Sequence, residues 1–161
     1  MISVSAIAAG SAAIADVFAL LHKAFAYMEG RIDPPSSLNR LTLDDIAETA
    51  ASGGVFGAFD GEDLVGCMFV RPDDDALYVG KLAVDPAHQG RGIGRLLMNE
   101  AEAQAARRDF SALRLQTRVE LTRNHHAFAQ LGFVKTAESA HDGYDRPTYI
   151  TMVKVIQSTT R

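Results

Sequence analysis

The part of this chain best suited to chemistry is a run with three glycines in five residues, Gln89-Gly90-Arg91-Gly92-Ile93-Gly94. We call residues 89–94 the glycine loop. Glycines leave backbone N–H groups uncovered and accept conformations that other residues avoid. A helical pattern follows the loop to about Arg108, and the N-terminus of a helix carries about half a positive charge. Exposed N–H groups at such a terminus bind anions, so the loop predicts a cradle for a phosphate group.

The spacing of the glycine loop excludes two nucleotide-binding loops. A P-loop needs a lysine and a serine or threonine directly after its last glycine, and no lysine follows here. The dinucleotide-binding fingerprint is Gly-x-Gly-x-x-Gly, whereas the third glycine here, Gly94, comes one residue early. The preceding strand also belongs to an antiparallel meander and not to repeated βαβ units.

Hydrophobic periodicity predicts the elements that position the loop. The expected strands cover 2–8, 55–59, 64–70, 76–84, 112–119, 133–139 and 148–155, and the expected helices cover 12–27, 42–51, 93–108 and 122–131. Because a helix connects strands 76–84 and 112–119, these two strands should lie parallel. We therefore expect an α/β fold in a single domain, residues 1–156, with a mixed, mostly antiparallel sheet flanked by helices. Residues 157–161 should form a polar C-terminal tail.

Local patterns add three finer expectations. Thr42 and Asp45 are spaced as a variant capping box for the second helix. Residues 71–75 contain a proline and three aspartates, which indicates a turn. The near-continuous apolar character of 76–84 predicts a strand buried on both faces.

Composition bounds the class of protein. The 161 residues are 47% hydrophobic and 22% charged, as in one soluble globular domain. The lone cysteine, Cys67, excludes an internal disulfide and indicates a reducing compartment. A signal peptide requires basic residues at its start, and no lysine or arginine precedes Lys23. No apolar run approaches the roughly 18 residues of a membrane span. We therefore expect a cytoplasmic protein with no membrane partner, and the histidine spacing predicts no metal.

Charge is unevenly distributed along the chain. Residues 88–123 carry 7 basic and 4 acidic residues, while residues 1–87 carry 5 basic and 13 acidic ones. This suits an anionic ligand at the glycine loop and a cationic one elsewhere, although turn and cap aspartates account for the acidity equally well. The net charge of −4 argues against a nucleic-acid partner.

The glycine loop and its flanks resemble one known family. The pattern Gln/Arg-x-x-Gly-x-Gly/Ala, preceded by Leu82-Ala83-Val84-Asp85-Pro86 and followed by Leu131-Gly132-Phe133, is similar to that of the GCN5-related N-acetyltransferases (GNAT). The resemblance covers roughly residues 2–155. It implies a GNAT-like fold, acetyl-CoA as the donor, and the amine of a small molecule as the acceptor, attacking directly in a ternary complex. Relatives often form homodimers.

The resemblance also implies donor-binding residues. The pyrophosphate of CoA would bind the backbone N–H groups of Gln89, Gly90, Arg91, Gly92, Ile93, Gly94 and Arg95. The pantetheine arm would pair with the backbone of Leu82, Ala83 and Val84, where one N–H would polarise the thioester carbonyl. Asn124 would contact the pantetheine and Phe128 would pack on CoA. Arg95 as a solvated helix residue and Asn124 as a local cap are open alternatives.

The general acid is where the chain departs from the family pattern. Relatives commonly carry a tyrosine at the position of Phe128, and a phenyl ring has no proton to give to the thiolate. We expect water, Tyr144 or Tyr149 to protonate the leaving thiolate, with Tyr78 as a further candidate.

The position of the usual general base also differs from the family pattern. Many relatives carry a carboxylate where this chain has Gly80, and the next residue, Lys81, is a poor base unless its pKa is strongly lowered. Glu120 and His141 are the candidate bases, beside a chain of waters. Cys67 is expected to be a buried structural residue and not a nucleophile.

The resemblance places the acceptor between residues 27–37 and 141–148. Acids in these segments suit a cationic amine, while Arg31 and Arg146 suit a carboxylate, so we expect an amino-acid-like acceptor. Two alternatives remain open. One is a protein or peptide N-acetyltransferase, favoured by an open groove. The other is a catalytically weakened acyl-CoA-binding module, favoured by Phe128 and Gly80.

Overall fold

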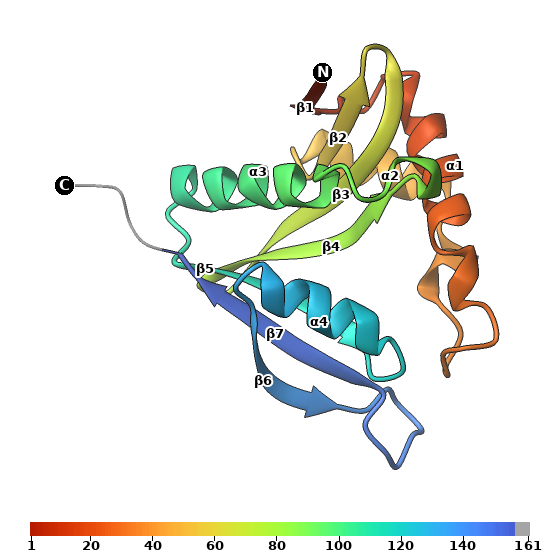
Figure 1. The fold of residues 1–161 in the computed structure, drawn as a ribbon, viewed down its shortest axis with the longest axis vertical. Helices are drawn as coiled ribbons and strands as arrows, with labels where there is room; N and C mark the ends of the chain where they lie inside the picture. Colours follow the sequence, from red (N-terminus) through yellow and green to blue (C-terminus); the bar gives the residue numbers. More distant parts are fainter. Residues whose placement is uncertain (157–161) are drawn as a thin grey trace.

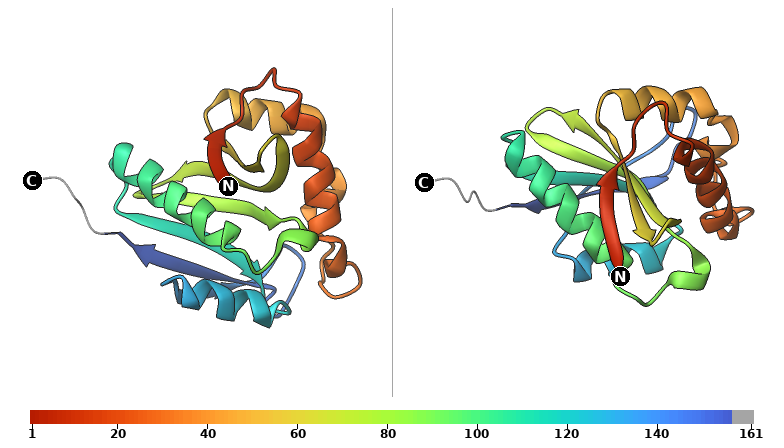
Figure 2. Two further views of the ribbon diagram at one scale, coloured as in Figure 1. Left: turned by 45° about the horizontal axis from the view of Figure 1, so that its top comes forward. Right: turned by 90° about the horizontal axis from the view of Figure 1, so that it is seen from above.

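The computed structural model describes residues 1–156, so the predicted tail at 157–161 lies outside the described residues. Seven strands form one sheet with helices on both faces (Figures 1 and 2). The strands are β1 (Ile2–Ala6), β2 (Val55–Asp60), β3 (Asp63–Asp73), β4 (Ala76–Val84), β5 (Ala112–Arg118), β6 (Val134–Ser139) and β7 (Tyr149–Val155). The helices are α1 (Ala13–Ala24), α2 (Leu43–Ala51), α3 (Ile93–Arg107) and α4 (Thr122–Gln130), with 3₁₀ turns η1 (Ala26–Met28), η2 (Ser37–Arg40) and η3 (Pro86–His88). The predicted order of elements and the α/β class are confirmed.

The sheet is mixed, as predicted. Its strand order is β1-β2-β3-β4-β5-β7-β6, and every neighbouring pair is antiparallel except β4 and β5. That parallel pair is short: Ala76–Tyr78 pair with Ala112–Arg114, and no pairing continues beyond them. β4 nevertheless runs on to Val84. The two central strands therefore separate after Tyr78, and the sheet is split at this point.

Two apolar cores fill the opposite faces of the sheet. On one face, α3 buries the predicted stripe Ile93, Leu97, Ala101 and Ala105. A Cβ at Gly66 of β3 would stand 2.8 Å from the Ile93 side chain, so glycine lets the helix approach the sheet closely. The other core joins α1, α2 and the sheet. Figure 2 shows α1 and α2 on one side and α3 on the other.

Local details match the sequence at one helix and depart from it at two strands. The Thr42–Asp45 capping box of α2 is present in both directions. The predicted turn at 71–75 is too long, because β3 pairs with β4 up to Asp73 and Arg114 holds Asp73 at 3.0 Å. The prediction that 76–84 is buried on both faces is wrong for its second half, because β5 has left β4 there and Leu82 stays half-buried.

Among the described residues, no helix is long and apolar enough to cross a membrane.

Candidate active site

The split between β4 and β5 begins where β4 carries a bulge. Cys67 of β3 pairs with Ala83 and Phe69 pairs with Gly80, so two residues of β4 oppose one of β3. Lys81 lies at this bulge with φ +49°, a conformation that a lysine rarely adopts. On the side of β5, the backbone groups of β4 beyond Tyr78 have no strand partner. An extended ligand would find free backbone donors and acceptors there, as in the addition of a strand.

A cavity of about 600 Å³ occupies this split, and we call it the split cavity. Its walls come from β4, β5 and α4, and from the two segments 25–40 and 141–149. Leu82 and Phe128, both expected at the donor, line it. Phe128 packs edge-on against Phe133, with ring centroids 6.1 Å apart, and is part of the apolar wall.

A second cavity, of about 580 Å³, lies beside the glycine loop, and we call it the loop cavity. Gln89 of the glycine loop and Arg31 line it, together with the start of α4. Leu121 and Asn124 line both cavities, so the two adjoin. Asn124 donates a hydrogen bond from Nδ2 to the Tyr27 hydroxyl at 3.3 Å, which positions this amide at the junction.

The glycine loop itself has the geometry that its sequence predicts. Gly90 and Gly92 have φ values of +82° and +77°, in the left-handed region that favours glycine. Gly92 is the N-cap of α3 and has no side-chain cap, so the first N–H groups of the helix are free to meet a ligand. A Cβ at Gly90, Gly92 or Gly94 would meet no atom within 4 Å, so the surface over the loop is open.

Charged groups next to the loop are already partly paired. Arg91 lies 3.7 Å from Asp60 and Arg95 is exposed. Asp85, just before η3, accepts a hydrogen bond from the backbone N–H of Ala87 and pairs with Lys23 at 3.2 Å. The Ala87 hydrogen bond and Lys23 hold the pKa of Asp85 below its usual value. These contacts anchor the chain as it leaves β4 and enters the loop.

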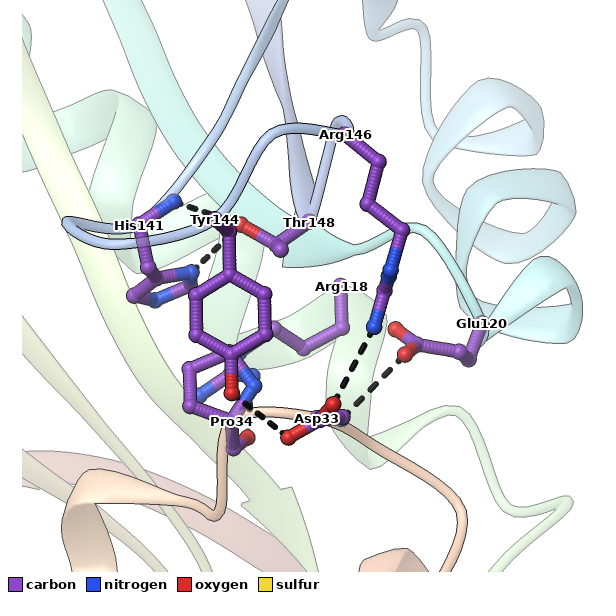
Figure 3. Close-up of polar contacts among 8 residues, drawn as sticks. All are labelled: Asp33, Pro34, Arg118, Glu120, His141, Tyr144, Arg146 and Thr148. Atoms are coloured by element: carbon purple, nitrogen blue, oxygen red, sulfur yellow. Dashed lines mark hydrogen bonds and ion pairs between the residues drawn. The ribbon is translucent and has the colours of Figure 1, made fainter.

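Two loops far apart in sequence meet at Asp33 (Figure 3). The Tyr144 hydroxyl donates to Asp33 Oδ1 at 2.6 Å, and Arg146 pairs with Asp33 Oδ2 at 3.1 Å. The backbone N–H of Asp33 donates to Glu120 at 3.2 Å. The candidate residues Glu120 and Tyr144 are therefore brought to one place, but both are engaged by Asp33. Glu120 and Tyr144 lie 87 and 111 residues from Asp33 in the sequence, so no local pattern could predict these contacts.

Arg118 at the end of β5 secures the same loop. Its guanidinium donates to the carbonyl of Pro34 at 2.5 Å and to that of Pro35 at 3.3 Å. Burial lowers the pKa of Arg118. No role was predicted for this arginine from the sequence. The structure shows that it fastens residues 33–35 over the split cavity, which it also lines.

His141 lines the split cavity, whereas Glu120 lines the loop cavity. His141 Nδ1 lies 2.5 Å from the Thr148 hydroxyl oxygen, and its ring packs edge-on against Tyr149 at 5.1 Å. Burial, followed by the nearby charge of Arg118, lowers the pKa of His141 below its ordinary 6.5. The imidazole is therefore neutral at pH 7, as a base must be.

Tyr78 covers the position where relatives carry a carboxylate. A Cβ at Gly80 would stand 3.1 Å from the Tyr78 ring, so the ring fills that space. The Arg71 guanidinium lies 4.3 Å from the centre of the same ring. Burial raises the pKa of Tyr78, so its hydroxyl keeps its proton. The sequence ranked this tyrosine behind Tyr144, and its place in the split cavity was not readable from strand periodicity.

Cys67 is fully buried in β3, as expected. Burial raises the pKa of its thiol to about 12, so the reactive thiolate is absent at neutral pH. Within residues 1–156, no three His, Cys, Asp or Glu side chains are grouped so that they could hold a metal ion.

Comparison with known proteins identifies the family. The model of the acetyltransferase (GNAT) family matches residues 15–133. No curated protein matches the chain. Three solved structures share the fold. PaiA N-acetyltransferase from Thermoplasma acidophilum, in complex with coenzyme A, has a TM-score of 0.78 at 14% identity, over 97% of this chain and 99% of that one.

The other two solved structures are named for different acceptors. The ribosomal-protein-S18-alanine N-acetyltransferase from Escherichia coli has a TM-score of 0.67 at 19% identity, over 100% of this chain and 97% of that one. Nourseothricin acetyltransferase has a TM-score of 0.57 at 27% identity, over 63% of this chain and 64% of that one. The shared fold therefore leaves the acceptor open.

Proposed function

The chain belongs to the acetyltransferase (GNAT) family, and we propose that it transfers the acetyl group of acetyl-CoA to the amine of a small molecule. The observation that carries this proposal is the split between β4 and β5, with the glycine loop directly after β4. One end of the adjoining cavities offers free N–H groups for a pyrophosphate, and the other offers unpaired strand backbone for a pantetheine arm. The similar PaiA N-acetyltransferase is a complex with coenzyme A.

In this proposal the glycine loop holds the pyrophosphate and Leu82, Ala83 and Val84 hold the pantetheine arm. A backbone N–H of this part of β4 polarises the thioester carbonyl, since it points to no strand partner on the side of β5. The acceptor amine attacks that carbonyl directly. A C–N bond forms, the C–S bond breaks, the amine loses one proton and the thiolate gains one.

We propose that His141 accepts the proton of the amine, because its hydrogen bonds suit the tautomer that a general base requires. The Thr148 hydroxyl oxygen accepts from the backbone N–H of His141 at 2.8 Å and lies 3.5 Å from the Ser139 carbonyl, to which it donates. We take the hydroxyl hydrogen to be directed at Ser139, so that the hydroxyl oxygen accepts from Nδ1–H of His141. This assignment leaves Nε2 unprotonated and able to take a proton.

The proton for the thiolate comes from a hydroxyl that lines the split cavity. Tyr144 was the leading candidate from the sequence, but its hydroxyl donates to Asp33. Tyr78 and Tyr149 line the same cavity, and within the described residues neither hydroxyl donates to a carboxylate; the Tyr78 hydroxyl is hydrogen-bonded to the backbone of Gln116. Tyr78→Phe, Tyr144→Phe and Tyr149→Phe, assayed for kcat, separate the three. The largest loss marks the acid, and three equal small losses indicate water.

Small acceptors are favoured over proteins by the closure above the cavity. Asp33, Tyr144 and Arg146 join the segment 33–35 to the segment 141–147, and Arg118 ties the first of these to β5. A polypeptide would need these contacts to open. The single buried thiol is compatible with action in the reducing cytoplasm.

The test is release of CoA thiol from acetyl-CoA with a panel of amines, amino acids and peptides, with acetylated products identified by mass spectrometry. We expect turnover of at least one small amine above the rate of hydrolysis. Turnover confined to peptides would favour a protein acceptor. Tight binding of CoA without turnover of any amine would favour a binding module and refute the enzyme.

A further inference from the structure

The charged side chains that line the split cavity are mostly cationic. They are Arg40, Lys81 and Arg118, against a single carboxylate, Asp142. Arg118 is satisfied by the carbonyls of Pro34 and Pro35. Arg40, in η2, is exposed at the cavity and makes no hydrogen bond or ion pair within residues 1–156. Within the described residues, the unpaired cations of the cavity are therefore Arg40 and Lys81.

Lys81 is the more unusual of the two. It is half-buried, and its ammonium forms no hydrogen bond or ion pair with the described residues. The ammonium nitrogen lies 5.4 Å from the centre of the Phe69 ring. Burial and the neighbouring charge of Arg71 lower the pKa of Lys81, and the charge of Asp45 offsets this only in part. A charge withdrawn from water without a partner is costly, so a site of this kind is completed by an anion.

The backbone of Lys81 supports a functional reading. Its φ of +49° is strained for a residue with a side chain, and such strain gathers at functional sites. A glycine would hold the same conformation without cost, and Gly80 stands next to it. The bulge thus places a lysine in the wall of the split cavity.

We propose that the acceptor is a small amine that carries a carboxylate, and that Lys81, assisted by Arg40, binds that carboxylate in the split cavity. The inference rests on the proposed function. The donor does not supply this anion, because its phosphates belong at the glycine loop and its pantetheine arm and thioester are uncharged. The sequence had assigned a carboxylate to Arg31 and Arg146, but Arg31 lines the loop cavity and Arg146 is paired with Asp33.

The rest of the cavity wall defines the body of the acceptor. Phe25, Met28, Leu38 and Tyr149 line the cavity in the segments 25–40 and 141–149, where we expect the acceptor. These side chains suit an apolar body between the amine and solvent. Amino acids with apolar side chains combine the three features, an amine, a carboxylate and an apolar body.

Matched pairs of amines test the proposal: phenylalanine against phenethylamine, leucine against 3-methylbutylamine, and 5-aminopentanoate against pentylamine. Each pair differs by a carboxylate. We expect the wild type to prefer the carboxylate member of at least one pair by about tenfold or more in kcat/KM. In Lys81→Met, which keeps the length of the side chain, that preference should fall by about tenfold while the neutral amine is turned over as before. Lys135→Met, on β6 beside Glu138, is the control and should change neither.

Two results would overturn the inference while leaving the acetyltransferase intact. One is a wild type that uses the neutral member of every pair as well as the acid. The other is a Lys81→Met enzyme that loses both members equally, which would assign Lys81 to the chemistry instead.

Binding distinguishes this inference from the proposed function. If no amine is turned over, binding at the same site can be measured from the melting temperature of the protein with CoA and either N-acetylphenylalanine or N-phenethylacetamide. Stabilisation by the acid alone, lost in Lys81→Met, supports the anion site even where the enzyme is refuted. Equal or absent stabilisation overturns it.

Discussion

Replacing Gly92 by alanine separates two roles of this glycine, in the backbone turn at the start of α3 and in the binding of the CoA pyrophosphate. Gly92 has φ +77° at the N-cap of α3, and a Cβ there would touch no atom within 4 Å. The stability cost is therefore backbone strain alone, about 1–2 kcal/mol. For a domain of this size, each kcal/mol lowers the melting temperature by roughly 2–4 °C. Gly61→Ala is the matched control, since Gly61 has φ +64° and equally open surroundings in the β2–β3 hairpin.

The two variants should differ in CoA binding. The new Cβ at Gly92 would occupy the open surface where the pyrophosphate meets the helix N-terminus. Loss of one charge-assisted hydrogen bond costs about 1.5–3 kcal/mol, which raises Kd by roughly 10- to 100-fold. Isothermal titration calorimetry with CoA, beside thermal unfolding, measures both effects. Gly94→Ala should bind CoA normally, because Gly94 has no positive φ and the family pattern allows alanine there.

The reasoning would be refuted if Gly92→Ala bound CoA as tightly as Gly61→Ala while losing the same stability. In that case the glycine would serve the turn and not the ligand. A variant that lost binding only because it unfolded would be recognised from its melting curve, since Gly61→Ala carries the same strain.

Three further predictions concern other parts of the site. His141→Gln should lower kcat by about 10²- to 10⁴-fold without changing the Kd of CoA, and wild-type activity should fall only at pH values below 6.5, since the pKa of His141 is lowered. The unfolded chain binds a proton at His141 more readily than the folded chain does, so the free energy of unfolding of the wild type should also fall as the pH drops below 6.5. In His141→Gln this fall should be smaller. A difference in unfolding free energy between the two proteins that does not change with pH would contradict the assignment. Native Cys67 should resist thiol reagents at pH 8, because the pKa of its thiol is about 12, and Cys67→Ala should stay active; rapid labelling of the native protein would show that the thiol is accessible. Asp33→Asn should raise the KM of the amine and leave the Kd of CoA unchanged, because it loosens Tyr144 and Arg146 over the split cavity and has no hydrogen bond or ion pair with the glycine loop. An unchanged KM would mean that these contacts do not shape the acceptor site.

Local patterns were sufficient to predict the elements and the position of the glycine loop before a helix. The Thr42–Asp45 capping box, the apolar stripe of α3 and the positive φ at Gly92 each depend on residues within a few positions of one another. Such features follow from propensity and spacing, so one sequence shows them. The parallel pairing of β4 with β5 followed from the connecting helix.

The rest depended on contacts between distant residues. The separation of β4 from β5 is a property of the whole sheet, and nothing in the apolar run 76–84 marks Tyr78 as its last paired residue. Asp33 contacts Tyr144 and Arg146, which lie 111 and 113 positions further along the sequence, beyond the range of any periodic pattern. Lys81 was weighed from the sequence only as a base, because its place at a bulge and its lack of an ion-pair partner among the described residues are properties of the folded chain.

The most direct test of the central claim is a crystal structure of the protein with CoA. The account predicts the pyrophosphate on the N–H groups of the glycine loop and the pantetheine arm between β4 and β5, alongside Leu82, Ala83 and Val84, with the sulfur in the split cavity near Tyr78. A CoA molecule bound outside the split, or with its phosphates at Lys81 in place of the glycine loop, would contradict it.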